Sequence, residues 1–88
     1  MMIYYRRPWD DSTGDPLSDS WGTSIFYFEV DENGEVLRQI QFFENGRKLK
    51  YSLNYIEDEF GMLSDVSLEP EEYKEFRIDQ GEFEAIWK

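Results

Sequence analysis

The side chains that could do chemistry in this chain are mostly carboxylates. Its 88 residues include twenty Asp and Glu but no His and no Cys. This composition removes the commonest general base, the thiolate nucleophile and the usual ligands of zinc. A pair of carboxylates could hydrolyse a glycosidic bond, but a domain of this size rarely has room for a sugar-binding cleft. The sequence also lacks a phosphate-binding loop, a dinucleotide fingerprint and a nucleophile elbow. We therefore expect a protein that is not an enzyme and that binds no cofactor.

The stretch DDSTGD, Asp10 to Asp15, is the one place where the sequence suggests a metal. It packs three Asp around a Gly, and carboxylates are preferred ligands of calcium. The spacing does not match an EF-hand loop, which needs ligands at alternate positions and a Glu at the twelfth. An ordinary acidic turn is the favoured interpretation, so we expect no metal site.

Negative charge is concentrated toward the C-terminus. Nine Lys and Arg leave a net charge of −11, of which −8 falls from Asn54 onward and −3 on residues 1–53. A polyanion of this kind is not expected to bind nucleic acid directly. The acidic residues are therefore either a solvated surface that maintains solubility or the complement of a basic partner.

The elements that must position these carboxylates begin with a β-sheet. Asn33-Gly34 and Asn45-Gly46 flank an apolar-rich run, and Asn-Gly between such runs is the strongest short-range signal for a hairpin with a two-residue type I′ turn. A first strand is expected at residues 2–6, ended by Pro8, and residues 9–22 are expected to form a loop. We expect residues 1–88 to form a single domain.

The C-terminal residues predict a short helix. Asp79 and Glu82 are spaced as in a capping box, and Phe83, Ile86 and Trp87 then lie on one helical stripe.

The segment before this helix has two interpretations. Pro70 could begin a helical turn that directs Tyr73 and Phe76 inward, whereas residues 75–78 alternate like a short strand. The expected fold class is α+β, an antiparallel β-meander of three to five strands with a short C-terminal helix packed on one face.

The two expected turns assign the strand side chains to two faces of the sheet. They pair Glu29 with Arg38, a structural ion pair expected to contribute about 0.2–1 kcal/mol. The first face, expected to form the core, collects Ile25, Tyr27, Val36, Ile40, Phe42, Leu49, Tyr51 and Leu53. The second face collects Phe26, Phe28, Val30, Leu37, Gln39, Gln41, Phe43, Lys48, Lys50 and Ser52.

The second face could be exposed to solvent or covered by another part of the chain. Antiparallel sheets commonly expose one face, and exposed aromatic side chains would mark a contact surface. The favoured alternative is that the loop at residues 9–22 covers them with Trp9, Leu17 and Trp21. Unpaired edges at residues 25–31 or 48–53 could also add a strand from a second copy and form a homodimer.

The N-terminal residues MMIYYRRPW place Arg6 and Arg7 before any long apolar run. Neither a secretory signal nor a membrane span fits this pattern. We expect a cytoplasmic location without membrane binding.

A family resemblance is carried by the stretch YFEVDENGEVLRQIQFFENGR, residues 27–47. The matching positions are Tyr27, Glu29, Asp31, Leu37, Arg38, Ile40, Phe43, Asn45, Gly46 and Arg47. They resemble an uncharacterised family of small bacterial domains, domain-of-unknown-function family 6881. The ending EFEAIW is similar to the closing helix of that family. Small orphan domains of this type often sit beside toxin genes, and this analogy of context favours an immunity or inhibitor role.

The charge and the missing catalytic side chains lead to one main hypothesis and two alternatives. The main hypothesis is an immunity-type, antitoxin-like inhibitor whose acidic surface blocks a basic site on a toxin or nuclease. The carboxylates expected to form this surface are Glu57, Asp58, Glu59, Asp65, Glu69, Glu71 and Glu72, with Asp10, Asp11 and Asp15 second. One alternative is a phage-type nucleic-acid mimic that inhibits a defence enzyme. The other is a regulatory or scaffold module that binds through Phe26, Phe28, Phe43, Lys48 and Lys50.

Overall fold

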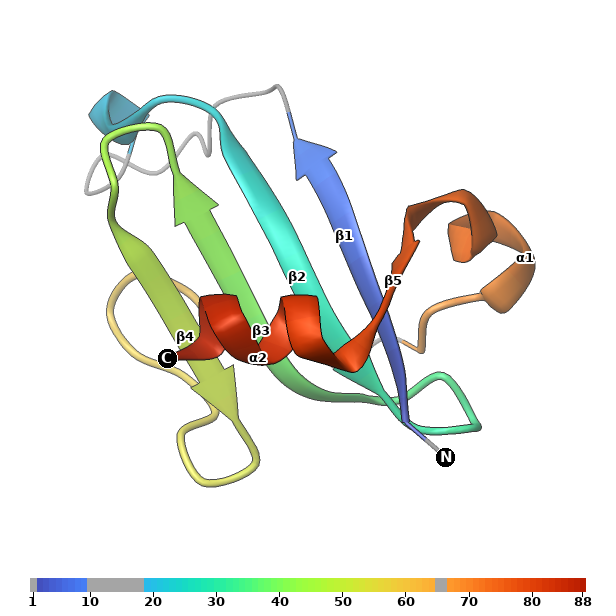
Figure 1. Cartoon of the computed structure of the whole chain (residues 1–88). Helices are drawn as coiled ribbons and strands as arrows, with labels where there is room; N and C mark the ends of the chain where they lie inside the picture. The colour runs from blue at the N-terminus through green and yellow to red at the C-terminus, as the bar shows by residue number, and fades with distance from the viewer. Residues whose placement is uncertain (1, 10–18, 65–66) are drawn as a thin grey trace.

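The computed structural model describes residues 2–9, 19–64 and 67–88. The elements in chain order are β1 (Ile3–Trp9), the 3₁₀ helix η1 (Asp19–Trp21), β2 (Ser24–Val30), β3 (Val36–Phe43), β4 (Lys48–Ser52), α1 (Pro70–Tyr73), the 3₁₀ helix η2 (Lys74–Phe76), β5 (Arg77–Ile78) and α2 (Gln80–Trp87). The strands form one antiparallel sheet in the order β4-β3-β2-β1-β5 (Figure 1). This arrangement confirms the α+β class, the antiparallel meander and the C-terminal helix.

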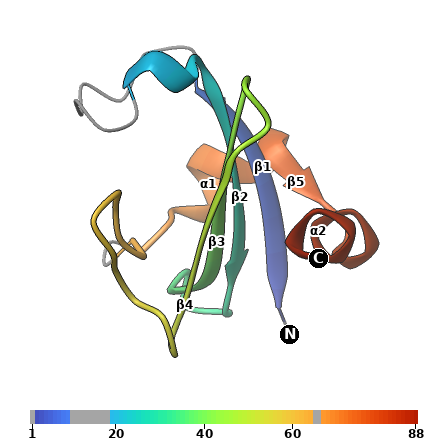
Figure 2. The same ribbon diagram turned by 90° about the vertical axis from the view of Figure 1, so that its left-hand side faces the viewer.

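Both faces of the sheet are covered. The helix α2 packs on one face, which we call the helix face, and residues 53–64 and 67–69 together with α1 cover the other, which we call the loop face (Figure 2). The buried core of the helix face is Tyr4, Tyr27, Ile40 and Phe83. The buried core of the loop face is Tyr5, Trp21, Phe28, Val30, Val36, Phe43, Leu49, Tyr51, Leu63, Leu68 and Tyr73.

The first Asn-Gly turn has three residues, not the two of the predicted type I′ turn. The amide of Gly34 donates to the carbonyl of Asp31, and the amide of Asp31 donates to the carbonyl of Glu35, both at 3.0 Å. Gly34 has a φ of +85°, whereas no described non-glycine residue, Asn33 included, has a positive φ. A type I′ turn needs positive φ at both central residues. The prediction of its type was therefore wrong.

A β-bulge compensates for the extra residue of this turn. Val30 pairs with Val36, but Glu29 pairs with Arg38, so the register shifts by one residue at Leu37. The predicted pairing of Glu29 with Arg38 is confirmed. Val36, however, opposes Val30 and lies on the loop face, which corrects its predicted place.

The second Asn-Gly turn has the same three-residue geometry. The amide of Gly46 donates to the carbonyl of Phe43 at 2.9 Å, and the amide of Phe43 donates to the carbonyl of Arg47 at 2.8 Å. Gly46 has a φ of +91°. The pairing of β3 with β4 runs without a register shift, so this extra residue is not compensated.

The faces predicted for β4 are consequently exchanged. Ile40 pairs with Lys50 instead of Tyr51, and a slip of one residue moves every side chain of a strand to the opposite face. Leu49 and Tyr51 are therefore buried on the loop face, and Lys48 and Lys50 lie on the helix face. The predicted composition of both faces was wrong for this strand.

The lysines of β4 contact the C-terminal end of α2. The Nζ of Lys50 donates to the carbonyl of Trp87 at 2.9 Å, and the Nζ of Lys48 donates to the carbonyl of Ile86 at 3.3 Å. The last carbonyls of a helix lack intrahelical partners and carry partial negative charge. Because the register of β4 is shifted by one residue, Lys48 and Lys50 lie where they can donate to these carbonyls.

The strand β1 runs past its predicted end. Pro8 pairs with Ile25 inside the strand, while β5 pairs only with Tyr4 and Tyr5. Pro8 thus lies where β1 is the outermost strand, a position that tolerates a missing backbone donor. The strand β2 is central, so the predicted free edge at residues 25–31 was wrong, whereas β4 is an edge strand.

The C-terminal helix is capped as the sequence predicts. The amide of Glu82 donates to Oδ1 of Asp79 at 2.8 Å. Phe83 is fully buried against the sheet, with Ile86 and Trp87 packed beside it. This confirms both the N-cap and the apolar stripe of α2.

The segment before α2 contains both the helical turn and the short strand that its sequence suggested as alternatives. Pro70 begins α1 and Tyr73 is buried, with its ring centroid 5.4 Å from that of Tyr5. Phe76 ends η2 and packs against the same core, and Arg77 begins the two-residue strand β5.

The two turn glycines give a matched test of the fold. Gly46→Ala is expected to lower the free energy of unfolding by about 1–2 kcal/mol, because left-handed φ is costly for a residue with a Cβ, although its Cβ would meet no atom within 4 Å. Gly34→Ala is expected to cost more, roughly 3 kcal/mol, because its Cβ would lie 2.5 Å from the Leu68 carbonyl oxygen. Urea unfolding of both variants measures the difference. Equal losses would contradict the close packing of Leu68 on this turn.

Candidate functional site

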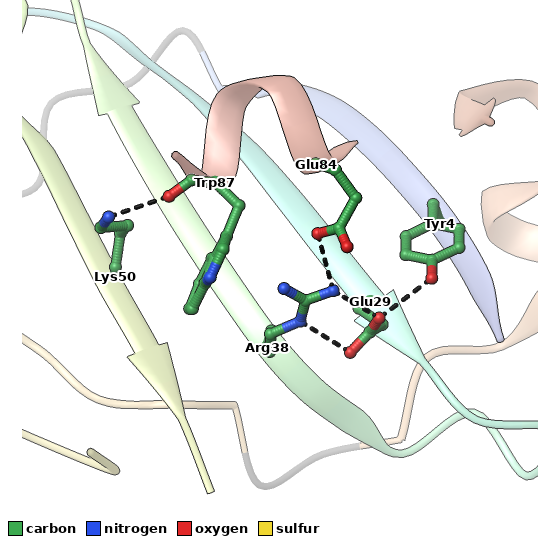
Figure 3. Close-up of polar contacts among 6 residues, drawn as sticks. All are labelled: Tyr4, Glu29, Arg38, Lys50, Glu84 and Trp87. Carbon is green, nitrogen blue, oxygen red and sulfur yellow. Dashed lines mark hydrogen bonds and ion pairs between the residues drawn. The ribbon is translucent and has the colours of Figure 1, made fainter. Parts of the chain in front are cut away.

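The buried carboxylate Glu29 lies at the centre of a polar cluster between the sheet and α2 (Figure 3). Arg38 donates to it from Nε to Oε1 at 2.9 Å and from Nη2 to Oε2 at 2.7 Å. The Tyr4 hydroxyl donates to Oε2 at 3.0 Å. The same Nη2 of Arg38 lies 2.9 Å from Oε1 of Glu84 on α2.

The electrostatics of this cluster indicate a structural role. The hydrogen bonds from Arg38 hold the pKa of Glu29 below its ordinary value, although burial acts in the opposite direction. The guanidinium also lies 4.9 Å from the ring centroids of both Phe83 and Trp87. Both oxygens of Glu29 accept hydrogen bonds from side chains of the sheet. The carboxylate therefore links β1, β2 and β3, and Arg38 connects it to α2, so its oxygens are not directed toward a ligand. The structural role agrees with the predicted pair, and two charge-assisted hydrogen bonds make the contact stronger than an ordinary cross-strand ion pair.

The exposed carboxylates of the inhibitor hypothesis that the structure describes lie in the layer that covers the loop face. Glu57 and Glu59 are exposed between β4 and Leu63, and Glu69, Glu71 and Glu72 are exposed at the start of α1. Figure 2 shows both segments on the side of the sheet opposite α2. We call residues 53–72, within the described ranges, the acidic layer. Four carboxylates of the sequence hypothesis, Asp10, Asp11, Asp15 and Asp65, lie outside the described residues.

The turn between β2 and β3 adds acidic residues that the sequence did not single out. The amide of Leu68 donates to the carbonyl of Gly34 at 2.8 Å. This contact brings the turn that carries the exposed side chains of Glu32 and Glu35 next to Leu68, which precedes α1. Only a contact between distant parts of the chain brings them there, so no local pattern could reveal it.

Asp58 differs from its acidic neighbours because its carboxylate accepts hydrogen bonds from groups within the acidic layer and the sheet. Its Oδ1 accepts hydrogen bonds from the Tyr51 hydroxyl and the Phe60 amide, both at 2.8 Å, and its Oδ2 accepts from the Tyr55 hydroxyl at 3.1 Å. Burial acts to raise the pKa of Asp58, but these hydrogen bonds outweigh it and hold the pKa below its ordinary value. Asp58 is therefore an anchor for the segment. It remains partly exposed, so its place on the binding surface stays a prediction.

The rest of this segment is tied to the sheet by backbone and amide groups. The amide of Leu63 donates to the carbonyl of Ile56 at 2.7 Å. The buried side chain of Gln39 donates from Nε2 to the Met62 carbonyl at 3.2 Å and accepts at Oε1 from the Ser64 amide at 2.9 Å. These bonds give residues 55–64 a defined shape without a regular element.

A pocket of about 270 Å³ opens in the acidic layer. Its lining residues are Glu35, Val36, Leu53, Ile56, Met62, Leu63, Ser64 and Ser67. Val36 and Leu63 are buried and form its floor, whereas Leu53, Ile56 and Met62 are exposed at its walls. No sequence pattern indicated this pocket: Leu53 was predicted in the sheet core, and neither Ile56 nor Met62 was assigned a surface role.

The aromatic residues of the scaffold hypothesis are not on an open face. Phe28 and Phe43 are buried, and Phe26 is partly buried in the same core. Trp21 contacts Phe43 edge-on with ring centroids 5.0 Å apart, and Trp9 contacts Phe26 at 6.2 Å. These two contacts agree with the predicted cover by Trp9 and Trp21, while Leu17 lies outside the described residues. The alternative of an open aromatic face was therefore wrong, and the favoured alternative, a covered face, agrees with the structure. Residues 53–64 and 67–76 supply most of the cover, which the sequence had assigned to the loop at residues 9–22.

The described ranges of residues hold no group of three or more carboxylates close enough to bind a metal ion. The calcium motif at residues 10–15 lies outside those ranges. None of the helices in the same ranges has the length and apolar character needed to cross a bilayer.

Comparison of the chain with protein-family models, with curated proteins and with solved structures found no match. The resemblance to domain-of-unknown-function family 6881 therefore stays a prediction.

Asp58→Asn tests the anchoring of the acidic layer. We expect faster hydrogen exchange at the amides of Phe60 and Gly61, which donate to Oδ1 at 2.8 and 3.2 Å, because a neutral acceptor forms weaker hydrogen bonds. Glu59→Gln, an exposed neighbour, is the matched control and should leave those rates unchanged. Unchanged exchange in Asp58→Asn would contradict the anchoring role.

Glu29→Gln tests the buried ion pair. It is expected to lower the free energy of unfolding at pH 7 by about 2 kcal/mol, because it removes charge-assisted hydrogen bonds from a buried site. The folded-state pKa of Glu29 lies below its ordinary value of 4.5, so its contribution is present above pH 4.5 and is lost as the pH falls through the lowered pKa. The difference from wild type should therefore narrow below pH 4.5 in urea titrations.

Glu84→Gln is the control for this experiment. Its carboxylate contacts the same Arg38 but its side chain is 39% exposed, so the expected loss is less than about 1 kcal/mol. A loss equal to that of Glu29→Gln would mean that the buried pair is not the main ionic contact.

Proposed function

We propose that this protein is a non-enzymatic inhibitor of immunity type, which binds a basic protein such as a toxin or nuclease through its acidic layer. One observation carries the proposal. Between Leu53 and Tyr73 the chain has seven acidic residues and no Lys or Arg, and the described part of this stretch covers one side of the sheet (Figure 2). The negative charge is therefore gathered on a surface and not spread evenly over the molecule.

The opposite side of the sheet has a different charge pattern. On the helix face, Lys48 and Lys50 contact carbonyls of α2, and Arg38 is paired with two carboxylates. Cationic side chains therefore lie among carboxylates and helix carbonyls on that face, unlike in the acidic layer. This contrast gives the molecule a polarised field, and such a field steers a cationic partner toward one side.

The acidic layer is also held in shape before binding. Asp58 and Gln39 tie residues 55–64 to the sheet through the hydrogen bonds described above. A preordered surface loses less conformational entropy when it binds. This property suits an inhibitor, which must compete with the natural ligand of its target.

Paired removal of charge tests the proposal. The protein is immobilised and used to capture partners from lysate of its host, and the affinity of the captured protein is then measured with purified variants. Glu57→Gln/Glu59→Gln and Glu71→Gln/Glu72→Gln are each expected to weaken binding about tenfold, with a shallower dependence on salt, because each removes two charges from the surface that attracts the partner.

The matched control removes two exposed carboxylates elsewhere. Glu75 and Glu82 line a different pocket together with Arg6 and Arg77, so their charge is already balanced locally. Glu75→Gln/Glu82→Gln should change the affinity less than twofold. A captured partner that is acidic and binds independently of salt, or equal losses in all three variants, would contradict the proposal. Capture of a DNA-binding defence enzyme whose DNA site becomes blocked would favour the nucleic-acid mimic instead.

A further inference from the structure

We infer that the pocket walled by Leu53, Ile56 and Met62 is the anchor point of the acidic layer, where one apolar side chain from a Lys- and Arg-rich segment of the partner is buried. The inference rests on the proposed function and specifies the chemistry of its partner. That partner is a basic protein segment with a single apolar residue between its cationic side chains.

The walls of the pocket are exposed apolar side chains. Leu53 is 63% exposed, Ile56 is 51% exposed and Met62 is 48% exposed. Four of the six exposed large apolar side chains in the described ranges lie within residues 53–62. Apolar surface concentrated in this way usually marks a contact site, and the flexible thioether of Met62 can adapt to an inserted side chain.

The size of the pocket suits a side chain. Its volume of about 270 Å³ is below the range of roughly 300–1,000 Å³ that is usual for small-molecule sites. The floor of Val36 and Leu63 is buried and apolar, so an apolar side chain would lose its contact with water there. Pockets of this kind hold the anchor residues that supply most of the binding energy in protein interfaces.

The negative charge around the pocket favours cationic partner residues on either side of the inserted apolar side chain. Glu35 is itself a lining residue, and Glu57 follows Ile56 and pairs with Met62 in an isolated β-bridge. The remaining polar lining is the neutral Ser64 and Ser67. Lys or Arg beside the anchor would be attracted, whereas an acidic segment or an anionic membrane surface would be repelled.

A second copy of the chain fits this surface poorly. A two-fold symmetric dimer brings the same patch of both subunits together. Here it would place two acidic layers against each other, and like charges across an interface are unfavourable. The complementary occupant is therefore a different, cationic protein.

Two blocked peptides serve as probes, Lys-Arg-Leu-Arg-Lys and Lys-Arg-Ser-Arg-Lys, each titrated into the full chain and followed by methyl NMR. Leu53, Ile56 and Met62 provide methyl signals at the pocket. The Leu peptide is expected to bind about tenfold more tightly than the Ser peptide and to shift all three methyl signals, because burying the Leu side chain adds apolar transfer energy to the same electrostatic attraction.

Two variants separate the pocket from the general charge. Ile56→Ser should abolish the preference for the Leu peptide while the affinity for the Ser peptide stays within twofold. Met2→Ser removes another apolar side chain, 44% exposed and absent from the pocket lining, and should preserve the full preference.

Three results would overturn the inference. Equal affinity for the two peptides would mean that charge alone attracts the partner; the proposed function would then still stand. Absence of binding by both peptides at low salt would reject the pocket as an anchor, while the capture experiment judges the proposed function independently. Methyl shifts that depend on protein concentration without peptide, together with a dimer in sedimentation, would assign the pocket to a second copy.

Discussion

The left-handed backbone at Gly34 and Gly46 is the constraint on which the rest of the structure depends. Each glycine completes a three-residue turn, and such a turn shifts the strand that follows by one residue relative to a two-residue turn. At Gly46 the shift is not compensated, so Tyr51 points to the loop face and Lys50 to the helix face. Tyr51 then donates to Asp58, which holds the acidic layer in place. The arrangement of both covering layers thus follows from turn geometry.

Covering both faces of a small sheet decides where function can reside. The large aromatic side chains of the strands are used for the two cores, and the ion pair of Glu29 with Arg38 links the sheet to α2. The surfaces left for a partner are therefore the outer sides of the covering segments. Between β4 and α1 these segments combine exposed carboxylates with exposed apolar side chains around one pocket. Charge provides long-range attraction to a partner, and apolar contact provides affinity at short range.

Features that depend only on neighbouring residues were the ones predicted most accurately from sequence. The Asp79 cap, the stripe of Phe83 and the helical start at Pro70 are local patterns, and each was confirmed. The pairing of Glu29 with Arg38 was also confirmed, although two deviations cancel to produce it, the longer first turn and the bulge at Leu37. No bulge follows the second turn, so a register counted from a two-residue turn assigned every side chain of β4 to the wrong face. An Asn-Gly pair is compatible with more than one turn length, and packing on both sides of the sheet selects between them.

The sequence by itself determined the α+β class, the hairpins, the capped helix and the strong acidity beyond Leu53, because propensity, capping and composition act over a few residues. The tertiary structure alone decided which faces are buried, that Asp58 is an internal anchor, and that Glu35 lies beside Met62 at one pocket. Those outcomes depend on contacts between distant segments, such as Leu68 on Gly34 and Gln39 on Met62. No local pattern specifies such contacts, since their energy is gained only after the chain has folded back on itself.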